Sequence, residues 1–111
     1  MVFVIEIRRY LTPGGEDVVG GWLVGLRDNR ARARILARLN RLSGGNFGDC
    51  KRLREGISEL RIDCGPGYRV YYSNLGRTSI LLLCGGDKQT QQADITRAAK
   101  YLRDYRQRST R

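Results

Sequence analysis

The sequence of 111 residues predicts a single α+β domain with the element order βααββββα, or with one strand fewer. Three observations lead to this fold class. Apolar residues alternate with a period of two near the N-terminus, recur at spacings of three and four up to about residue 42, and then form short β-prone runs between glycine-containing turns. With 41% apolar residues, the chain can bury one core. The domain is therefore expected to span residues 1–111 without a linker.

The first strand is expected within residues 2–8. Its two sets of alternating side chains are Phe3, Ile5 and Ile7 on one face, and Val2, Val4, Glu6 and Arg8 on the other. The sequence Thr-Pro-Gly-Gly at residues 12–15 then breaks the chain.

Two helices are expected next, because the apolar spacing changes to three and four. The first runs from Glu16 to about Leu26, with acidic residues at its start, and Asp28 can cap the second. The second helix has an apolar stripe of Ile35, Leu36, Leu39 and Leu42, and Ser-Gly-Gly-Asn at residues 43–46 stops it. We interpret Trp22 as a core residue, and we interpret a second stripe as a solvated helix face: Arg27, Arg30, Arg34, Arg38 and Arg41.

The rest of the chain predicts an antiparallel meander and a closing helix. The strands are expected at residues 49–54, 57–64, 67–74 and 77–84, with Gly-Gly-Asp at residues 85–87 ending the last strand. The helix is expected from Ala93 to about Arg106, with residues 107–111 frayed. Its inward face should hold Ile95, Ala98, Ala99 and Leu102.

Composition limits the possible functions. The formal net charge is +10, which favours a polyanionic or acidic partner, and the chain has no histidine. The missing histidine excludes an HExxH zinc site and every Ser-His-Asp or Cys-His nucleophile. Three cysteines without a CxxC spacing predict reduced thiols in a cytoplasmic protein, with no disulfide framework and no metal site. The sequence has no apolar stretch of the ~18 residues that would span a bilayer, so no membrane association is expected.

Strand alternation predicts where some of the basic residues lie. Leu60 must face the core, which places Arg61 on the opposite face, and antiparallel pairing through the turn at residues 65–67 would bring Arg69 beside it, with Tyr71 beyond. Lys51 or Arg52 and the later Lys88 could form the rim. The simpler interpretation is that these arginines are solvated, or that Arg61 is neutralised by Glu59 or Asp63. Gly-Gly-Asp-Lys at residues 85–88 is interpreted as a turn, because the spacing of a phosphate-binding loop is missing.

Four motifs in order resemble a known family: Asn-Phe-Gly-Asp-Cys-Lys at residues 46–51, Gly-Ile-Ser-Glu-Leu-Arg-Ile-Asp at 56–63, Gly-Pro-Gly-Tyr-Arg-Val-Tyr-Tyr at 65–72, and Leu-Leu-Leu-Cys-Gly-Gly-Asp-Lys-Gln-Thr-Gln at 81–91. With these motifs the chain resembles the addiction-module killer proteins, the HigB-like branch of the RelE/ParE toxin superfamily. The resemblance covers nearly the whole chain, and the sequence departs from the family pattern at Cys50, Arg52 and Arg54.

The resemblance implies a helical hairpin packed on a twisted antiparallel sheet, in the toxin of a type II toxin-antitoxin module. It implies an endoribonuclease that cleaves mRNA on the ribosome without metal or cofactor, and a cognate antitoxin that is often a helix-turn-helix protein. Carried over to this chain, the central catalytic pair is Arg61 and Arg69, supported by Lys51, Lys88 and Tyr71, with RNA-binding groups at Arg52 and Arg54. The proton-transfer groups would come from Lys51, Lys88, Tyr71 or Glu59. Two alternatives stay open: a ParE-like inhibitor of DNA gyrase, and a toxin that has decayed into an antitoxin-binding module.

Overall fold

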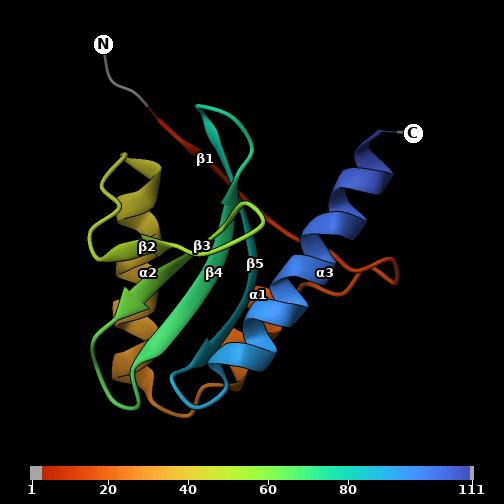
Figure 1. Ribbon diagram of the computed structural model, residues 1–111. Coiled ribbons are helices and arrows are strands. Elements are labelled where there is room, and N and C mark those ends of the chain that lie inside the picture. The colour runs from red at the N-terminus through yellow and green to blue at the C-terminus, as the bar shows by residue number, and fades with distance from the viewer. Residues whose placement is uncertain (1–3, 111) are drawn as a thin grey trace.

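The computed structural model describes residues 4–110, which form a five-stranded sheet with helices on both faces. Figure 1 shows α2 and α3 on opposite sides of the sheet. The elements follow the predicted order, and the α+β class is confirmed: β1 (Glu6–Arg9), α1 (Val18–Gly25), α2 (Asn29–Ser43), β2 (Cys50–Arg52), β3 (Ile57–Ile62), β4 (Tyr68–Asn74), β5 (Ser79–Asp87) and α3 (Gln91–Ser109).

The sheet combines two kinds of pairing. Strands β2 to β5 form the expected antiparallel meander, whereas β1 lies at the opposite edge and pairs in parallel with β5, with Ile7 opposite Ile80. The α1–α2 hairpin makes this topology possible, because it carries the chain from one edge of the sheet to the other. Within the expected first strand, Ile5 is buried and Glu6 is exposed, as the alternation predicts, while residues 1–3 lie outside the described part of the chain.

The two helices of the hairpin begin at aspartates that cap them. The carboxylate of Asp17 accepts a hydrogen bond from the backbone N–H of Gly20, and that of Asp28 accepts from Arg30 and Ala31. Each bond satisfies N–H groups that have no partner within the first helical turn. The cap at Asp28 lies in the short connection between α1 and α2 and marks where α2 begins.

Helix α2 buries a narrower apolar stripe than the sequence predicts. Ile35, Leu39 and Leu42 are buried, but Leu36 is 44% exposed. Arg38 also departs from the expected solvated face, because its guanidinium donates to the backbone carbonyls of Arg61, Phe47 and Asp49 and so ties α2 to β3. The other four arginines of the stripe are exposed, as expected: Arg27, Arg30, Arg34 and Arg41.

Strand β5 continues through the two glycines that were expected to end it. A Cβ atom on Gly85 would lie 2.3 Å from the ring of Trp22 in α1, and one on Gly86 would lie 1.8 Å from the carboxylate of Asp94 in α3. The two glycines therefore let a helix approach each face of the strand closely. The prediction of a strand end was wrong because glycine here serves close packing and not chain reversal.

Helix α3 is longer than expected at both ends. Its inward residues are buried as predicted, namely Ile95, Ala98, Ala99 and Leu102. The expected fraying is wrong for residues 107–109, which are helical. Arg108 holds this end by pairing with Asp104 at 2.7 Å and by donating to the carbonyl oxygen of Leu11. None of the helices in residues 4–110 has the length and apolar composition needed to cross a membrane.

Candidate functional site

The β3–β4 hairpin brings Arg61 and Arg69 directly opposite each other, as the sequence predicts. The turn closes with a hydrogen bond from the N–H of Gly67 to the carbonyl of Cys64, which sets this register. The two arginines line a cavity of about 200 Å³ at this end of the sheet. The remaining lining residues are Asp49, Asp63 and Lys88. We call this cavity the arginine-pair pocket.

A buried carboxylate lies between the two guanidinium groups. Glu59 is only 3% exposed, and its Oε1 accepts a hydrogen bond of 3.1 Å from Nε of Arg61. Its Oε2 lies 3.8 Å from Nε of Arg69 and accepts a hydrogen bond from the side chain of Gln91 at 2.9 Å. This negative charge offsets the repulsion between two like charges placed opposite each other. Of the two carboxylates proposed as partners for Arg61, Glu59 forms the hydrogen bond.

The arginines keep hydrogen-bonding capacity for a ligand. Among residues 4–110, Arg61 donates a hydrogen bond only through Nε, and Arg69 only from Nη1 to the carbonyl oxygen of Tyr68, at 3.0 Å. Nη1 of Arg61 also lies 4.0 Å from Oδ1 of Asp49, which is an ion pair without a hydrogen bond. Nε of Arg69 is buried without a hydrogen-bond partner in the described structure. Because a guanidinium has five N–H donors, most remain unused, and this arrangement suits the oxygens of a phosphate. The side chain of Arg61 is 33% exposed and that of Arg69 only 10%, so Arg61 is the more accessible of the two.

The two candidate lysines have different positions. Lys88 lines the arginine-pair pocket, and its aliphatic chain lies against Gly67, where a Cβ would come within 2.8 Å of the lysine Cε. Gly67 has a φ of +81° and thus serves both the turn and this contact. Lys51 is exposed on β2 opposite Glu59, and it does not line the pocket.

Tyr71, the expected catalytic tyrosine, is not part of the accessible surface. It lies on the predicted sheet face but is fully buried in a cluster with Ile95, Ala98 and Leu102 of α3. Its hydroxyl has no hydrogen-bond partner in the described residues, and burial raises the pKa of the phenol well above its usual range. Strand alternation assigns a residue to a face, but it does not show that a helix covers that face.

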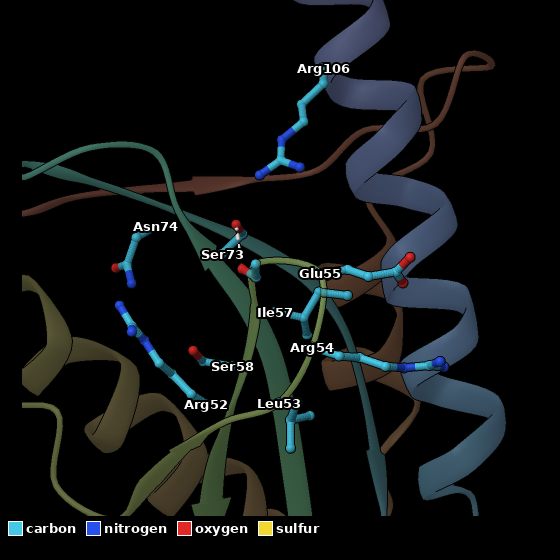
Figure 2. Close-up of a pocket in the computed structure, with 10 residues that line it drawn as sticks. Arg52, Leu53, Arg54, Glu55, Ile57, Ser58, Ser73, Asn74 and Arg106 are labelled. Atoms are coloured by element: carbon cyan, nitrogen blue, oxygen red, sulfur yellow. Dashed lines mark hydrogen bonds between the residues drawn. The ribbon is translucent and has the colours of Figure 1, made fainter.

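Arg52 and Arg54 line a different cavity, of about 320 Å³, at the other end of β3 (Figure 2). Arg106 of α3 also lines this cavity. Strand alternation gives no signal for Arg106, because this residue lies on a helix that is distant in sequence from the β2–β3 hairpin. Gln91 was likewise missed, although its position in the first turn of α3 brings it to Glu59.

The three cysteines differ in their exposure. All three are free, with Cys50 exposed, Cys64 partly buried and Cys84 buried. Burial raises the pKa of the Cys84 thiol to about 12, which keeps it protonated and unreactive near neutral pH. Among residues 4–110, no group of three or more potential metal ligands comes together.

The fold and the pocket together define a small α+β protein with paired arginines on one sheet face. No protein-family model matches the chain. Over 94 residues it is 56% identical to an uncharacterized protein of Haemophilus influenzae, a match that covers 85% of this chain and 89% of that protein. The chain belongs to the same family as this Haemophilus influenzae protein.

Proposed function

We propose that the protein is the toxin of a type II toxin-antitoxin module, a HigB-like member of the RelE/ParE superfamily that cleaves ribosome-bound mRNA in the cytoplasm. The observation that carries this proposal is the pairing of Arg61 and Arg69 in one pocket with Lys88. The four sequence motifs support it independently, since both arginines lie at motif positions.

The pocket supports cleavage by the RNA's own 2′-hydroxyl group. The 2′-oxygen attacks the adjacent phosphorus, the bond to the 5′-oxygen breaks, and a 2′,3′-cyclic phosphate and a 5′-hydroxyl result. The two guanidinium groups stabilise the charge that develops on the phosphoryl oxygens. Glu59 holds Arg61 by a hydrogen bond, so this group is already oriented before the substrate binds.

We assign the proton-transfer group by asking which of the candidate side chains has access to the pocket. Tyr71 is buried under α3, which leaves Lys51, Lys88 and Glu59. Glu59 already accepts a hydrogen bond at each carboxylate oxygen, whereas Lys88 is exposed and lines the pocket. Lys88 is therefore the best-placed group to protonate the leaving 5′-oxygen.

A second candidate function rests on the ion pair between Arg61 and Glu59. An ion pair between an arginine and a buried carboxylate can also serve the structure alone. In that case the basic surface would belong to a non-catalytic module that binds an acidic antitoxin segment. A ParE-like inhibitor of gyrase is the other alternative within the same superfamily. In each case the expected partner is an antitoxin, which in this branch is often a helix-turn-helix protein.

Induction of the chain without its antitoxin distinguishes these functions. The 5′ ends of mRNA in ribosome-bound fractions and gyrase-linked DNA breaks should be mapped in the same cells. We expect growth arrest with new mRNA ends aligned to codons and no increase in DNA breaks. Growth arrest with DNA breaks alone would assign the gyrase function, and normal growth at a high protein level would assign the binding module.

A further inference from the structure

We infer that the cavity between the β2–β3 hairpin and α3 binds a phosphate of single-stranded RNA, at a distance from the arginine-pair pocket. Three arginines line it, Arg52, Arg54 and Arg106, of which we assign the principal role to Arg52 and Arg106. This inference rests on the proposed function for the identity of the ligand as RNA. We call the cavity the hairpin pocket.

The arginines of the hairpin pocket have no counter-ion among the described residues, unlike those of the arginine-pair pocket. Within residues 4–110, Arg52, Arg54 and Arg106 form no side-chain hydrogen bond and no salt bridge. The one carboxylate that lines the cavity, Glu55, is 3.5 Å from Arg103. Unpaired guanidinium groups gathered at one cavity repel each other, and a bound anion removes this repulsion.

The hairpin turn gives this cavity a fixed shape. The carbonyl of Arg54 accepts a hydrogen bond of 2.9 Å from the N–H of Ile57, and the two residues between them have positive φ angles of +55° for Glu55 and +80° for Gly56. These features define a type I′ turn. Glu55 occupies its first central position, where the positive φ is uncommon for a residue other than glycine. The hydroxyl of Ser73 on β4 donates to the carbonyl of Gly56 at 2.8 Å and holds the turn against the sheet.

A glycine in the turn brings one guanidinium close to the backbone. A Cβ on Gly56 would lie 3.1 Å from Nη2 of Arg106, so a larger residue there would crowd the arginine head. Figure 2 shows Arg106 extending from α3 toward Ser73, while Arg52 lies on the other side of the cavity beside Asn74. Arg54 extends toward α3 instead. Two arginines thus reach the cavity from opposite sides.

The lining favours RNA over an acidic peptide. Guanidinium groups bind phosphate oxygens through paired N–H donors, and the exposed side chain of Asn74 adds an amide that can bind a ribose hydroxyl. Peptide recognition usually requires an accessible apolar anchor site. Here the apolar lining consists of Leu53, which is partly buried, and Ile57, which is 1% exposed.

Strand β3 connects this cavity to the proposed catalytic site. Ile57 lines the hairpin pocket, and Arg61 lines the arginine-pair pocket on the same face of the strand, four residues further along, which corresponds to ~13 Å. Lys51, exposed on β2 opposite Glu59, lies between them. A single RNA strand that follows β3 would meet both pockets, and the second contact would add affinity because it is intramolecular.

The test is RNA binding by variants of the hairpin pocket. The probe is a fluorescein-labelled oligouridine of about ten nucleotides, 2′-O-methylated to prevent cleavage, titrated by anisotropy at several salt concentrations. We expect Arg52→Gln and Arg106→Gln each to weaken binding by roughly 3- to 10-fold and to lower the salt slope by about 0.7, one phosphate contact on a single strand. Arg54→Gln should have a smaller effect.

The matched control is Arg30→Gln. Arg30 is an exposed arginine on α2 without a side-chain partner in the described structure, and its replacement removes the same charge. We expect less than a twofold change for it. The inference is overturned if Arg52→Gln and Arg106→Gln weaken RNA binding no more than this control. It is also overturned if they spare RNA binding and weaken binding of a labelled oligoglutamate.

A second assay, cleavage of an unmodified mRNA on ribosomes, distinguishes failure of this inference from failure of the proposed function. If the wild-type protein does not cleave but the two variants lose affinity, the proposed enzyme activity fails and the hairpin pocket stands. If the wild-type protein cleaves and the two variants behave like Arg30→Gln in both assays, the enzyme activity stands and the hairpin pocket fails.

Discussion

The two faces of the sheet are packed in different ways. The face under α1 and α2 is closed by apolar side chains, among them Leu60, Val70 and Leu82. The face under α3 begins with an apolar cluster around Leu83, but it changes toward the start of that helix into a polar group of Glu59, Arg69 and Asp94, all buried. One face therefore holds the fold together, and the other also holds charges in fixed positions.

The position of α3 explains this difference. Where the helix covers the sheet, a side chain such as Tyr71 is excluded from solvent even though its face carries the candidate site. Where the helix begins, Gln91 reaches Glu59, and the neighbouring Arg61 stays accessible. Function should consequently depend on the polar end of the α3 face, while the α1–α2 face should contribute to stability alone.

The largest effect is expected at the polar end of the α3 face. Arg61→Gln removes a cation that faces the scissile phosphate, and loss of such a contact costs about 2.7 to 4 kcal/mol of barrier, or roughly 100- to 1000-fold in cleavage rate. Glu59 keeps its hydrogen bond to Gln91, so the protein should still fold, with a stability loss of about 1 to 3 kcal/mol. Cleavage of ribosome-bound mRNA and a urea titration measure the two quantities. Wild-type cleavage by the variant would show that this face is not the site.

A smaller effect, on stability alone, is expected on the other face. Gly85→Ala places a Cβ 2.3 Å from the ring of Trp22, and such overpacking costs about 1 to 3 kcal/mol. The free energy of unfolding in urea measures it, and cleavage per folded molecule should be unchanged. Gly21→Ala is the control, because a Cβ there meets nothing within 4 Å and alanine favours the helix. Equal stability of the two variants would refute this packing account.

The smallest effect is expected at Tyr71. Tyr71→Phe removes a buried hydroxyl that has no partner in the described residues, so stability should rise slightly, by less than about 1 kcal/mol. Cleavage should not change, because the phenol has no access to the pocket. A drop in cleavage comparable to that of Arg61→Gln would assign Tyr71 a catalytic role. It would contradict our view that the part of the sheet covered by α3 serves packing only.

The sequence predicts those features that depend on alternation and local chain reversal. The pairing of Arg61 with Arg69 followed from the turn at residues 65–67 and the outward side of β3, because a period of two leaves only one face for each residue. The aspartate cap of α2 followed in the same way from its position before the apolar stripe.

Features that depend on packing between distant elements could not be predicted. Gly85 and Gly86 were interpreted as a strand end, although their role is to admit Trp22 and Asp94 from two helices. The approach of Arg106 to Gly56 depends on the placement of α3 against the β2–β3 hairpin, for which local spacing has no signal. The parallel pairing of β1 likewise depends on where the α1–α2 hairpin returns the chain.

The most direct test of the central proposal is the Arg69→Ala variant expressed beside the wild-type protein at equal level, with new mRNA 5′ ends counted in ribosome-bound fractions. Arg69 belongs to the arginine-pair pocket and has little exposed surface outside it. We predict that the variant folds and binds the antitoxin, yet produces no codon-aligned ends and no growth arrest. Full toxicity with an unchanged set of mRNA ends would contradict the assignment of this pocket as the site of RNA cleavage.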